Sequence, residues 1–471
     1  MSKRVAIIGA GFSGTMTAVQ LARRGLDVTL IGRAPQVGKG VAYSTEDPVH
    51  LLNIRAGKMG AWPEAPTDFA NVTGFDPEAY VLRMHFGKYL RDILDASAVT
   101  LVEGEAVGAE PGWTVQMADG SSIAADALVL APGNQAPDAL PFARDLPERL
   151  FAADPWGPAG RAAIAKAVAS GGDVLVIGSG LSMIDVALSL DAAGHRGKLV
   201  AVSRRGQWPR IHLERMSAVP SSDDAPTGSL RALFRWVRQR TGECEWRDAV
   251  DSVRPRTHEF WQSLSLDDQR RFMRHARPWW DVHRHRIAPK AGEIVERMIA
   301  DGRMEVLAGR VQALRELEER PSTSSGRADV RGTSESLSSG RANLGDGTLE
   351  AVIRRRGAVE VDAPRRFAVG INCTGPLHAI ARTRDPVLRS LLDAGLAEPD
   401  ALGIGIEVDD EARVIGPNAP QSQRPSTGSG QRLWAMGSLG KARFWEIIAV
   451  PDIRVQAAQV ADAIAKELHD V

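Results

Sequence analysis

Residues 3–33 read KRVAIIGAGFSGTMTAVQLARRGLDVTLIGR, and this stretch decides the fold. A short apolar run over residues 5–8 leads into a glycine turn. Helical spacing follows over residues 15–24, and a second apolar run covers residues 26–31. The order strand, turn, helix, strand is typical of the first unit of a dinucleotide-binding domain.

The residues of the turn have separate physical tasks. Gly9 permits the tight turn, Gly11 lets a pyrophosphate approach the backbone, and Gly14 lets the helix pack closely on the strand. Phe12 and Ser13 open the helix, whose unpaired amides favour a diphosphate. These five residues are predicted to bind a dinucleotide. The acidic residue that usually binds the ribose is missing, and Gly32-Arg33 stands in its place, so Arg33 is a further candidate contact.

A second unit of the same order begins at Asp173. Apolar residues 174–177 precede the turn 178–183, helical spacing covers 184–193, and another apolar strand covers 198–202. Met183 replaces the third glycine, so the predicted nucleotide contacts are Gly178, Gly180, Leu181 and Ser182. Ser203, Arg204 and Arg205 follow the strand, where cations bind the 2′-phosphate of NADP(H). We therefore expect NADPH to be preferred over NADH, although two adjacent arginines can also be solvated surface charge.

Composition excludes several classes of protein. The 471 residues suffice for two or three domains, and 58 basic against 58 acidic residues provide no field that would attract nucleic acid or a membrane surface. Cys244 and Cys373 are the only cysteines, so neither a disulfide framework nor a CxxC redox motif is present. We expect a cytoplasmic protein without nucleic-acid or membrane partners. Its oligomeric state cannot be inferred.

Residues 216–290 have the spacing of a helical insertion, and the part from 271 to 286 concentrates arginine, histidine and tryptophan. So many arginines argue against a metal site, and no metal is predicted. Arg277, Trp280 and His283 are candidates for binding an anionic or planar aromatic substrate; the alternative is a solvated helix face with buried tryptophans. Serine- and glycine-rich segments at 320–347 and 420–431 are expected to be disordered surface insertions. Deletion of about 321–343 is expected to leave flavin content and melting temperature nearly unchanged.

The chain resembles a two-dinucleotide flavoprotein, and more closely the YdhS-like FAD/NAD(P)-binding proteins, a group that shares its N-terminal domain with an FAD-dependent urate hydroxylase. The resemblance is carried by residues 9–14, 40–45, 50–53, 83–90, 154–156, 178–185, 372–376 and 445–456. It implies an α/β fold with two Rossmann-like domains and a helical insertion. An FAD-binding domain would comprise 1–168 and 360–471, and an NAD(P)H-binding domain 169–359. Gly133, Gly375 and Gly437, in turns after further strands, would also contact the cofactors.

A more distant similarity concerns the flavin-containing and N-hydroxylating monooxygenases. Asn53, followed by Lys58, Met59 and Trp62-Pro63, looks like the loop in which an asparagine lies beside the flavin; the alternative for Asn53 is a loop-capping amide. The linker histidine motif of those enzymes is absent, and Asp154-Pro155-Trp156 occupies that interval.

These resemblances imply an FAD-dependent NAD(P)H oxidoreductase. The main hypothesis is a monooxygenase that uses dioxygen to hydroxylate a small polar or heterocyclic substrate such as urate, with the cofactors FAD and NADPH (or NADH) performing the redox chemistry. The alternatives are an NAD(P)H:acceptor reductase without oxygenation and a non-enzymatic flavin or nucleotide redox sensor. A disulfide reductase would need a cysteine pair, which the sequence lacks.

Overall fold

The structure is a computed structural model that describes residues 3–214, 219–317, 347–377, 379–417 and 431–469. Apart from Gly347 and Gln431, the two serine- and glycine-rich segments lie outside the described residues, as does the prediction that they can be deleted. Of the helices in the described part of the chain, none is both long and apolar enough to cross a lipid bilayer.

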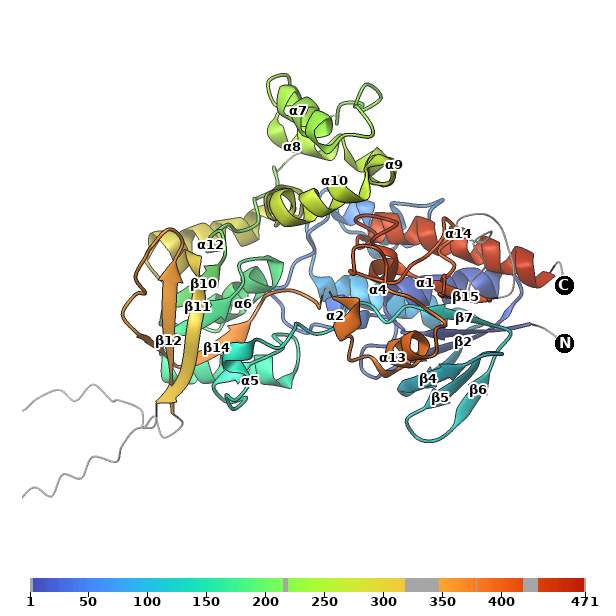
Figure 1. The fold of residues 1–471 in the computed structure, drawn as a ribbon, viewed down its shortest axis with the longest axis horizontal. Helices are drawn as coiled ribbons and strands as arrows, with labels where there is room; N and C mark the ends of the chain where they lie inside the picture. Colours follow the sequence, from blue (N-terminus) through green and yellow to red (C-terminus); the bar gives the residue numbers. More distant parts are fainter. Residues whose placement is uncertain (1–2, 215–218, 318–346, 378, 418–430, 470–471) are drawn as a thin grey trace, which may run out of the picture. The chain divides into compact units, whose positions relative to one another are not determined.

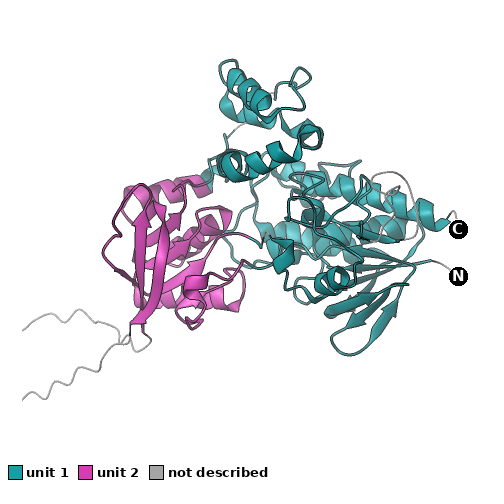
Figure 2. Cartoon of the chain, viewed as in Figure 1, with its two compact units in different colours: residues 1–136, 209–290, 376–471 teal, residues 137–208, 291–375 magenta. Residues whose placement is uncertain are grey.

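The chain forms two compact units, which Figure 2 colours separately. Unit 1 comprises residues 1–136, 209–290 and 376–471, and unit 2 comprises 137–208 and 291–375. These boundaries differ from those expected from the sequence in three places. Residues 137–168 and 360–375 belong to unit 2, because their strands join its sheet, and the helical insertion clusters with unit 1.

Unit 1 is built on a five-stranded parallel sheet in the order β15-β7-β1-β2-β3. Its strands are β15 (Leu433–Ala435), β7 (Ala127–Leu130), β1 (Arg4–Ile8), β2 (Asp27–Gly32) and β3 (Thr100–Glu103). In β1, Val5 and Ile7 enter one hydrophobic cluster, and Ala6 and Ile8 enter another. Both faces of the sheet are therefore covered, which explains why its central strand is an uninterrupted apolar run.

Helices cover one face of this sheet, and a small second sheet lies in the cluster on the other face. On the first face α1 (Phe12–Arg23) packs against α14 (Val450–His469), and the two run side by side in Figure 1. α4 (Arg83–Asp95) packs against α1 as well. The other cluster contains residues of the antiparallel sheet β4-β5-β6 and of α13. The bounds of these elements are β4 (Ala106–Glu110), β5 (Thr114–Met117), β6 (Ser122–Ala124) and α13 (Pro386–Asp393).

The segment between β2 and α4 contains short helices. They are α2 (Gly40–Tyr43), η1 (Ala56–Lys58) and α3 (Asp68–Thr73). α4 begins at Arg83, and the residues directly before it are extended. The reason is tertiary: Leu82 forms a β-bridge with Leu51, and the Leu52 amide donates to the carbonyl of Val81, so these residues are held extended.

Unit 2 contains a seven-stranded sheet in the order β13-β12-β11-β10-β9-β14-β8. The strands from β11 to β8 pair in parallel, and β12 and β13 add antiparallel strands at one edge. The strands are β8 (Phe151–Ala152), β9 (Val174–Ile177), β10 (Leu199–Ser203), β11 (Met304–Leu317), β12 (Thr348–Arg355), β13 (Arg365–Phe367) and β14 (Val369–Asn372). The helices of unit 2 are α5 (Pro158–Ser170), α6 (Leu181–Ala192) and most of α12 (Pro289–Ala300).

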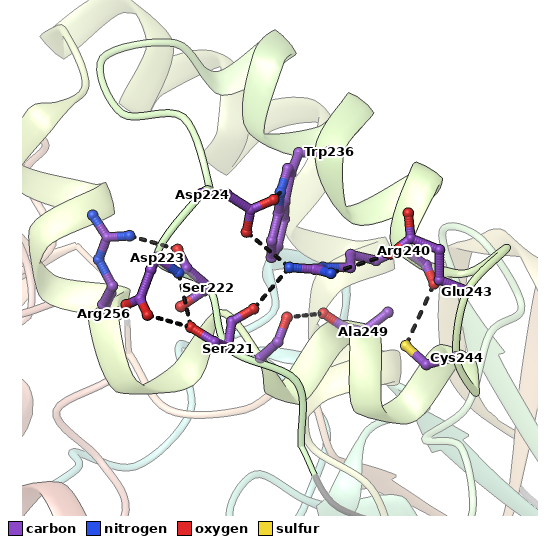
Figure 3. A network of polar contacts seen from close by, with 11 residues as sticks. Ser221, Ser222, Asp223, Asp224, Trp236, Arg240, Glu243, Cys244, Ala249 and Arg256 are labelled. Carbon is purple, nitrogen blue, oxygen red and sulfur yellow. Dashed lines mark hydrogen bonds and ion pairs between the residues drawn. The ribbon is translucent and has the colours of Figure 1, made fainter.

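The insertion of unit 1 consists of short helices, as predicted from its spacing. They are α7 (Leu230–Arg240), α8 (Trp246–Asp251), α9 (Thr257–Ser263), α10 (Leu266–Arg271), the π-helical turn η4 (Phe272–Ala276) and α11 (Arg277–Arg284). A polar network fixes its outer part (Figure 3). Arg240 lies 4.8 Å over the Trp236 ring, and Asp224 accepts hydrogen bonds from Trp236 Nε1 (3.1 Å) and from Arg240 (2.8 Å). Arg256 donates to the carbonyl of Ser222 (2.5 Å) and so ties the same loop to the next helices.

Candidate functional site

The turn between β1 and α1 contains two glycines that the fold itself requires. Gly9 has a φ of +107°, and a Cβ there would lie 2.1 Å from the Ala131 carbonyl oxygen. A Cβ at Gly14 would lie 1.9 Å from the carbonyl oxygen of Gly9. Any side chain at either position would therefore collide with backbone, as the sequence predicts for a tight turn and a close helix–strand contact.

Gly11 is different, because nothing within the protein requires a glycine there. It is the N-cap of α1, with φ −82° and ψ −171°, which any residue can adopt. The nearest atom to an added Cβ is the Cα of Gly40 at 3.5 Å, an ordinary contact. The end of α1 has neither a side-chain cap nor an acidic residue in its first turn. Its amides and the bare Gly11 backbone thus fit the diphosphate of a dinucleotide such as FAD.

The turn between β9 and α6 in unit 2 repeats this geometry closely. Gly178 has a φ of +111°, and its Cβ would lie 2.1 Å from the carbonyl oxygen of Cys373. Gly180 caps α6 with φ −87°, and an added Cβ would meet no atom within 4 Å. Leu181 and Ser182 open α6 as Phe12 and Ser13 open α1. Unit 2 therefore has a second site that fits a dinucleotide diphosphate.

Other predicted cofactor contacts in unit 1 come together at the first turn. A Cβ on Gly437 would lie 2.9 Å from Ser13 Oγ, and Ser438 Oγ donates to the Gly133 carbonyl (3.3 Å). The Gly437 amide donates to Gln456 Oε1 on α14 (3.0 Å). In unit 2, Gly375 follows β14 by the same three positions by which Gly133 follows β7, and both have positive φ.

The two predicted ribose-contact positions each follow the second strand of their unit. Arg33 comes directly after β2, is exposed, and pairs with Glu105 at 3.4 Å. Ser203 is the last residue of β10, and Arg204 and Arg205 follow it, the first of them exposed and the second half-buried. The binding of a ribose or a 2′-phosphate by these residues remains a prediction.

The loop that carries Asn53 is tied to the insertion by two residues that the sequence analysis did not single out. His212 Nε2 donates to the backbone carbonyl of Asn53 (3.1 Å). Arg55 is 5 % exposed, and its guanidinium donates to the carbonyls of Glu78 (2.8 Å), Leu213 (2.7 Å) and Glu214 (2.9 Å). The backbone of this loop is therefore fixed from across the chain. No sequence signal distinguishes Arg55 from a solvated arginine.

His212 is held in its neutral form. Burial, followed by the positive charge of Arg286, lowers its pKa from 6.5 to about 3. Its ring also lies 5.5 Å from that of Tyr80, whose pKa burial raises to about 12. A neutral imidazole with Nε2 protonated is the tautomer that can donate to the Asn53 carbonyl.

This histidine gives a prediction for stability against pH. Between pH 6.5 and about 3 the unfolded chain binds one proton more than the folded protein at His212, so this group lowers stability as the pH falls below 6.5. At pH 5 the contribution is at most about 2 kcal/mol. Replacing His212 with glutamine removes this titration, while the glutamine amide can still donate to the Asn53 carbonyl. When the pH falls from 7 to 5, the free energy of unfolding of His212→Gln should therefore decrease less than that of the wild type, by up to about 2 kcal/mol.

Urea unfolding at both pH values measures this difference. His85→Gln, a change of an exposed histidine on α4, is the matched control and should lose as much stability as the wild type. An equal loss in the His212→Gln variant would contradict the prediction.

The three candidate substrate residues on α11 all make contacts within unit 1. Arg277 Nε pairs with Asp281 (3.2 Å), and Trp280 Nε1 donates to Glu446. His283 Nδ1 lies 2.7 Å from the Trp279 carbonyl, and its ring stands edge-on to Trp246 at 5.1 Å. Binding of a substrate by these three residues remains a prediction.

Glu446 joins α11 to the segment before α14 and is conformationally unusual. It is 7 % exposed and has a φ of +66°, which is rare for a residue with a side chain. Arg284 pairs with it at 2.9 Å. Burial raises the pKa of this carboxyl, but the charge of Arg284 and the contact with Trp280 outweigh it, so the pKa lies below its usual value. Backbone strain of this kind persists only where the surroundings fix it, as this buried ion pair does.

Among the described residues, no group of three or more histidine, cysteine, aspartate or glutamate side chains is placed to hold a metal ion. Two possible ligands in the arginine- and histidine-rich part of the insertion have other partners: Asp281 pairs with Arg277, and the ring of His283 contacts Trp246.

Comparisons with known proteins agree with this architecture. Residues 6–135 match the model of a family described as FAD-NAD(P)-binding. L-lysine 6-monooxygenase from Pseudomonas syringae has a similar structure, with a TM-score of 0.63, 15% sequence identity and 99% coverage of each chain. An ornithine N-hydroxylase from Kutzneria sp. 744, in complex with reduced FAD, NADP+ and L-ornithine, is similar with a TM-score of 0.63 and 13% sequence identity. The match covers 99% of this chain and 100% of that chain.

Thioredoxin reductase from Lactococcus lactis is also similar, with a TM-score of 0.52, 12% identity and full coverage of both chains. No curated protein sequence matches the chain. At these identities the likeness concerns the fold: a mixed α/β protein with one parallel sheet and one mostly parallel sheet, each followed by a glycine turn and a helix. Residues 6–135, which contain the first turn, are the part that matches the FAD-NAD(P)-binding family model.

Proposed function

We propose that this protein is an FAD-dependent NAD(P)H oxidoreductase, and that it acts as a monooxygenase on a small anionic substrate. The first turn, with Gly11 and the amides of α1, would hold the diphosphate of FAD. The second turn, with Gly180, would hold that of NADPH. When bound, the two cofactors supply hydride transfer and oxygen activation, and the protein contributes binding, orientation and exclusion of water.

The observation that carries the proposal is the fixed loop around Asn53. Its backbone accepts a hydrogen bond from His212, and Arg55 of the same loop donates to the carbonyls of Glu78 and Leu213, so Asn53 lies on a loop of unit 1 whose backbone is held from other parts of the chain. Such fixed orientation is what an enzyme needs when the cofactor performs the chemistry. The similar lysine and ornithine hydroxylases support this assignment of function by analogy of fold.

Lys58, on the same loop, favours an anionic substrate. Its side chain is exposed, and its ammonium makes no ion pair or hydrogen bond within 4 Å among the described residues. Although the side chain as a whole is exposed, partial burial of its ammonium and the charge of Arg254 lower its pKa against the opposing charges of Asp251 and Glu78, and an arriving anion would stabilise the charged form. Urate, which the YdhS-like resemblance suggests, is such an anion at neutral pH through loss of a ring N–H proton, and an amino acid offers a negative charge through its carboxylate.

The two cysteines argue against a disulfide reductase, although thioredoxin reductases are among the proteins of similar fold. Cys244 belongs to unit 1 and Cys373 to unit 2, and both are free. Burial raises the pKa of each thiol, so neither is activated as a thiolate. A reductase of another acceptor remains the alternative, and a flavin-based redox sensor is a second one.

The test is NADPH oxidation by the purified protein against a panel of anionic metabolites under ¹⁸O₂. We expect at least one compound to accelerate oxidation and to gain one labelled oxygen atom. Acceleration without label in the product would identify an acceptor reductase instead, and no acceleration by any compound would favour the sensor.

With an accelerating compound in hand, Lys58→Met should raise its KM about tenfold or more, since a charge-assisted contact contributes roughly 1.5 to 3 kcal/mol. FAD content should not change. Lys88→Met removes an exposed lysine of α4, which pairs with Asp92 at 2.6 Å, and serves as the matched control with an unchanged KM. An unchanged KM in Lys58→Met would exclude this lysine from the substrate site.

A further inference from the structure

A chain of hydrogen bonds in unit 2 joins the dinucleotide turn to the loop that carries the two arginines. Ser179, between the glycines of the second turn, is 8 % exposed. Its hydroxyl lies 2.7 Å from Ser203 Oγ, and it also contacts the carbonyl oxygen of Gln207. The Gly206 amide donates to Ser203 Oγ at 3.0 Å. The chain thus spans the whole loop 203–207.

The direction of these hydrogen bonds follows from the number of available protons. The carbonyl of Gln207 can only accept, so the single hydroxyl proton of Ser179 must be donated to it. Ser203 therefore donates its own proton to Ser179 Oγ and accepts the Gly206 amide. With this arrangement the Ser203 hydroxyl has no proton left for a phosphate. Its task is to close the loop.

The loop itself has no freedom to compensate for a missing contact by simple rotation. Gly206 has a φ of +62°, and a Cβ there would lie 2.7 Å from the backbone nitrogen of Ala308 on β11. Loop 203–207 is therefore held between Ser179 of the dinucleotide turn and strand β11. Arg204 and Arg205 lie within this closed turn.

From these contacts we propose that Ser179 is a positioning residue for nicotinamide selectivity: it holds the 203–207 turn so that Arg204 and Arg205 meet the 2′-phosphate of NADPH. The proposal rests on the proposed function of unit 2 as the NADPH site. It assigns a role to the residue between the two glycines of the turn. That residue affects the 2′-phosphate only through the arginines.

The experiment compares the binding of 2′,5′-ADP and 5′-AMP to the FAD-loaded protein by calorimetry, so it needs neither a substrate nor turnover. The wild type should bind 2′,5′-ADP more tightly. Ser179→Ala should weaken 2′,5′-ADP binding about five- to tenfold, the loss of roughly one to one and a half kcal/mol of hydrogen bonding. It should change 5′-AMP binding less than about twofold, since the pyrophosphate side of the turn is intact.

Ser170→Ala is the matched control. Ser170 ends α5, and its hydroxyl contacts the backbone at the opposite end of β9, so both affinities should stay at wild-type values. If Ser179→Ala does not fold, Ser179→Cys keeps a side chain of similar size with a weaker donor and should show a smaller selective loss.

Equal weakening of both nucleotides in Ser179→Ala would overturn the inference, because the serine would then serve the turn as a whole. So would an unchanged preference for 2′,5′-ADP. A wild-type protein without that preference would instead refute the assignment of unit 2 to NADPH, and the inference would fall with it.

Discussion

Replacing Gly11 with valine should give a folded protein that has lost most of its FAD. The extended backbone of Gly11 suits a β-branched residue, and the nearest atom to its Cβ would be 3.5 Å away, so the fold has room for the side chain. The proposed diphosphate site does not. Overlap of this kind costs at least about 1.4 kcal/mol, so FAD affinity should fall roughly tenfold or more.

Gly180→Val in unit 2 provides the reciprocal experiment. No atom lies within 4 Å of an added Cβ at Gly180, so this variant should also fold. It should keep its FAD and lose NADPH binding instead. Flavin absorbance after gel filtration and calorimetry with NADPH distinguish the two variants. If Gly11→Val retained full FAD occupancy, or if both variants lost the same cofactor, the assignment of one dinucleotide to each unit would be wrong.

The double change Arg204→Ala, Arg205→Ala should raise the KM for NADPH at least about tenfold and leave the KM for NADH nearly unchanged. A guanidinium binds a 2′-phosphate through charge-assisted hydrogen bonds, each contributing roughly 1.5 to 3 kcal/mol. Both residues follow β10 directly, at the position of the adenosine ribose in a dinucleotide unit. The measurement is steady-state NAD(P)H oxidation with an artificial electron acceptor.

A matched control removes the same charge elsewhere in unit 2. Arg196 and Arg310 are exposed, and their double replacement by alanine should leave both KM values unchanged. Equal losses with both nicotinamides in the Arg204/Arg205 variant would show that these arginines serve folding or the pyrophosphate. Equal use of NADH and NADPH by the wild type would already contradict the selectivity.

The two nucleotide turns could be predicted from the sequence because glycine is required where backbone atoms leave no space for a side chain. Gly9 and Gly178 both press against the carbonyl of a returning strand, and this contact recurs with nearly the same geometry in both units. The absence of a third glycine at Met183 did not alter the turn, since Met183 is fully buried within the unit. The glycines that these distant contacts require lie together in one short motif, with the apolar strand and the helical spacing on either side of it, and for this reason the motif can be read from the sequence.

The contacts around Asn53 could not be predicted in this way. His212 and Asn53 are separated by 159 positions, and their hydrogen bond depends on how the insertion packs on unit 1. Arg55 binds carbonyl oxygens, which every residue offers, so its partners leave no trace in the sequence. The start of α4 at Arg83 has the same cause, because the pairing of Leu82 with Leu51 is decided by tertiary structure.

The way in which the chain passes back and forth between its two units constrains how it can be made. The sheet of unit 1 needs β15, at residues 433–435, and that of unit 2 needs β14, at 369–372, between β9 and β8. During synthesis, the ribosome must therefore pass residue 372 before the second sheet can close, and residue 435 before the first can. Until then, the edge of β7 that pairs with β15 and the face of α1 that packs against α14 lack partners that are translated last, and these surfaces are where a chaperone would act.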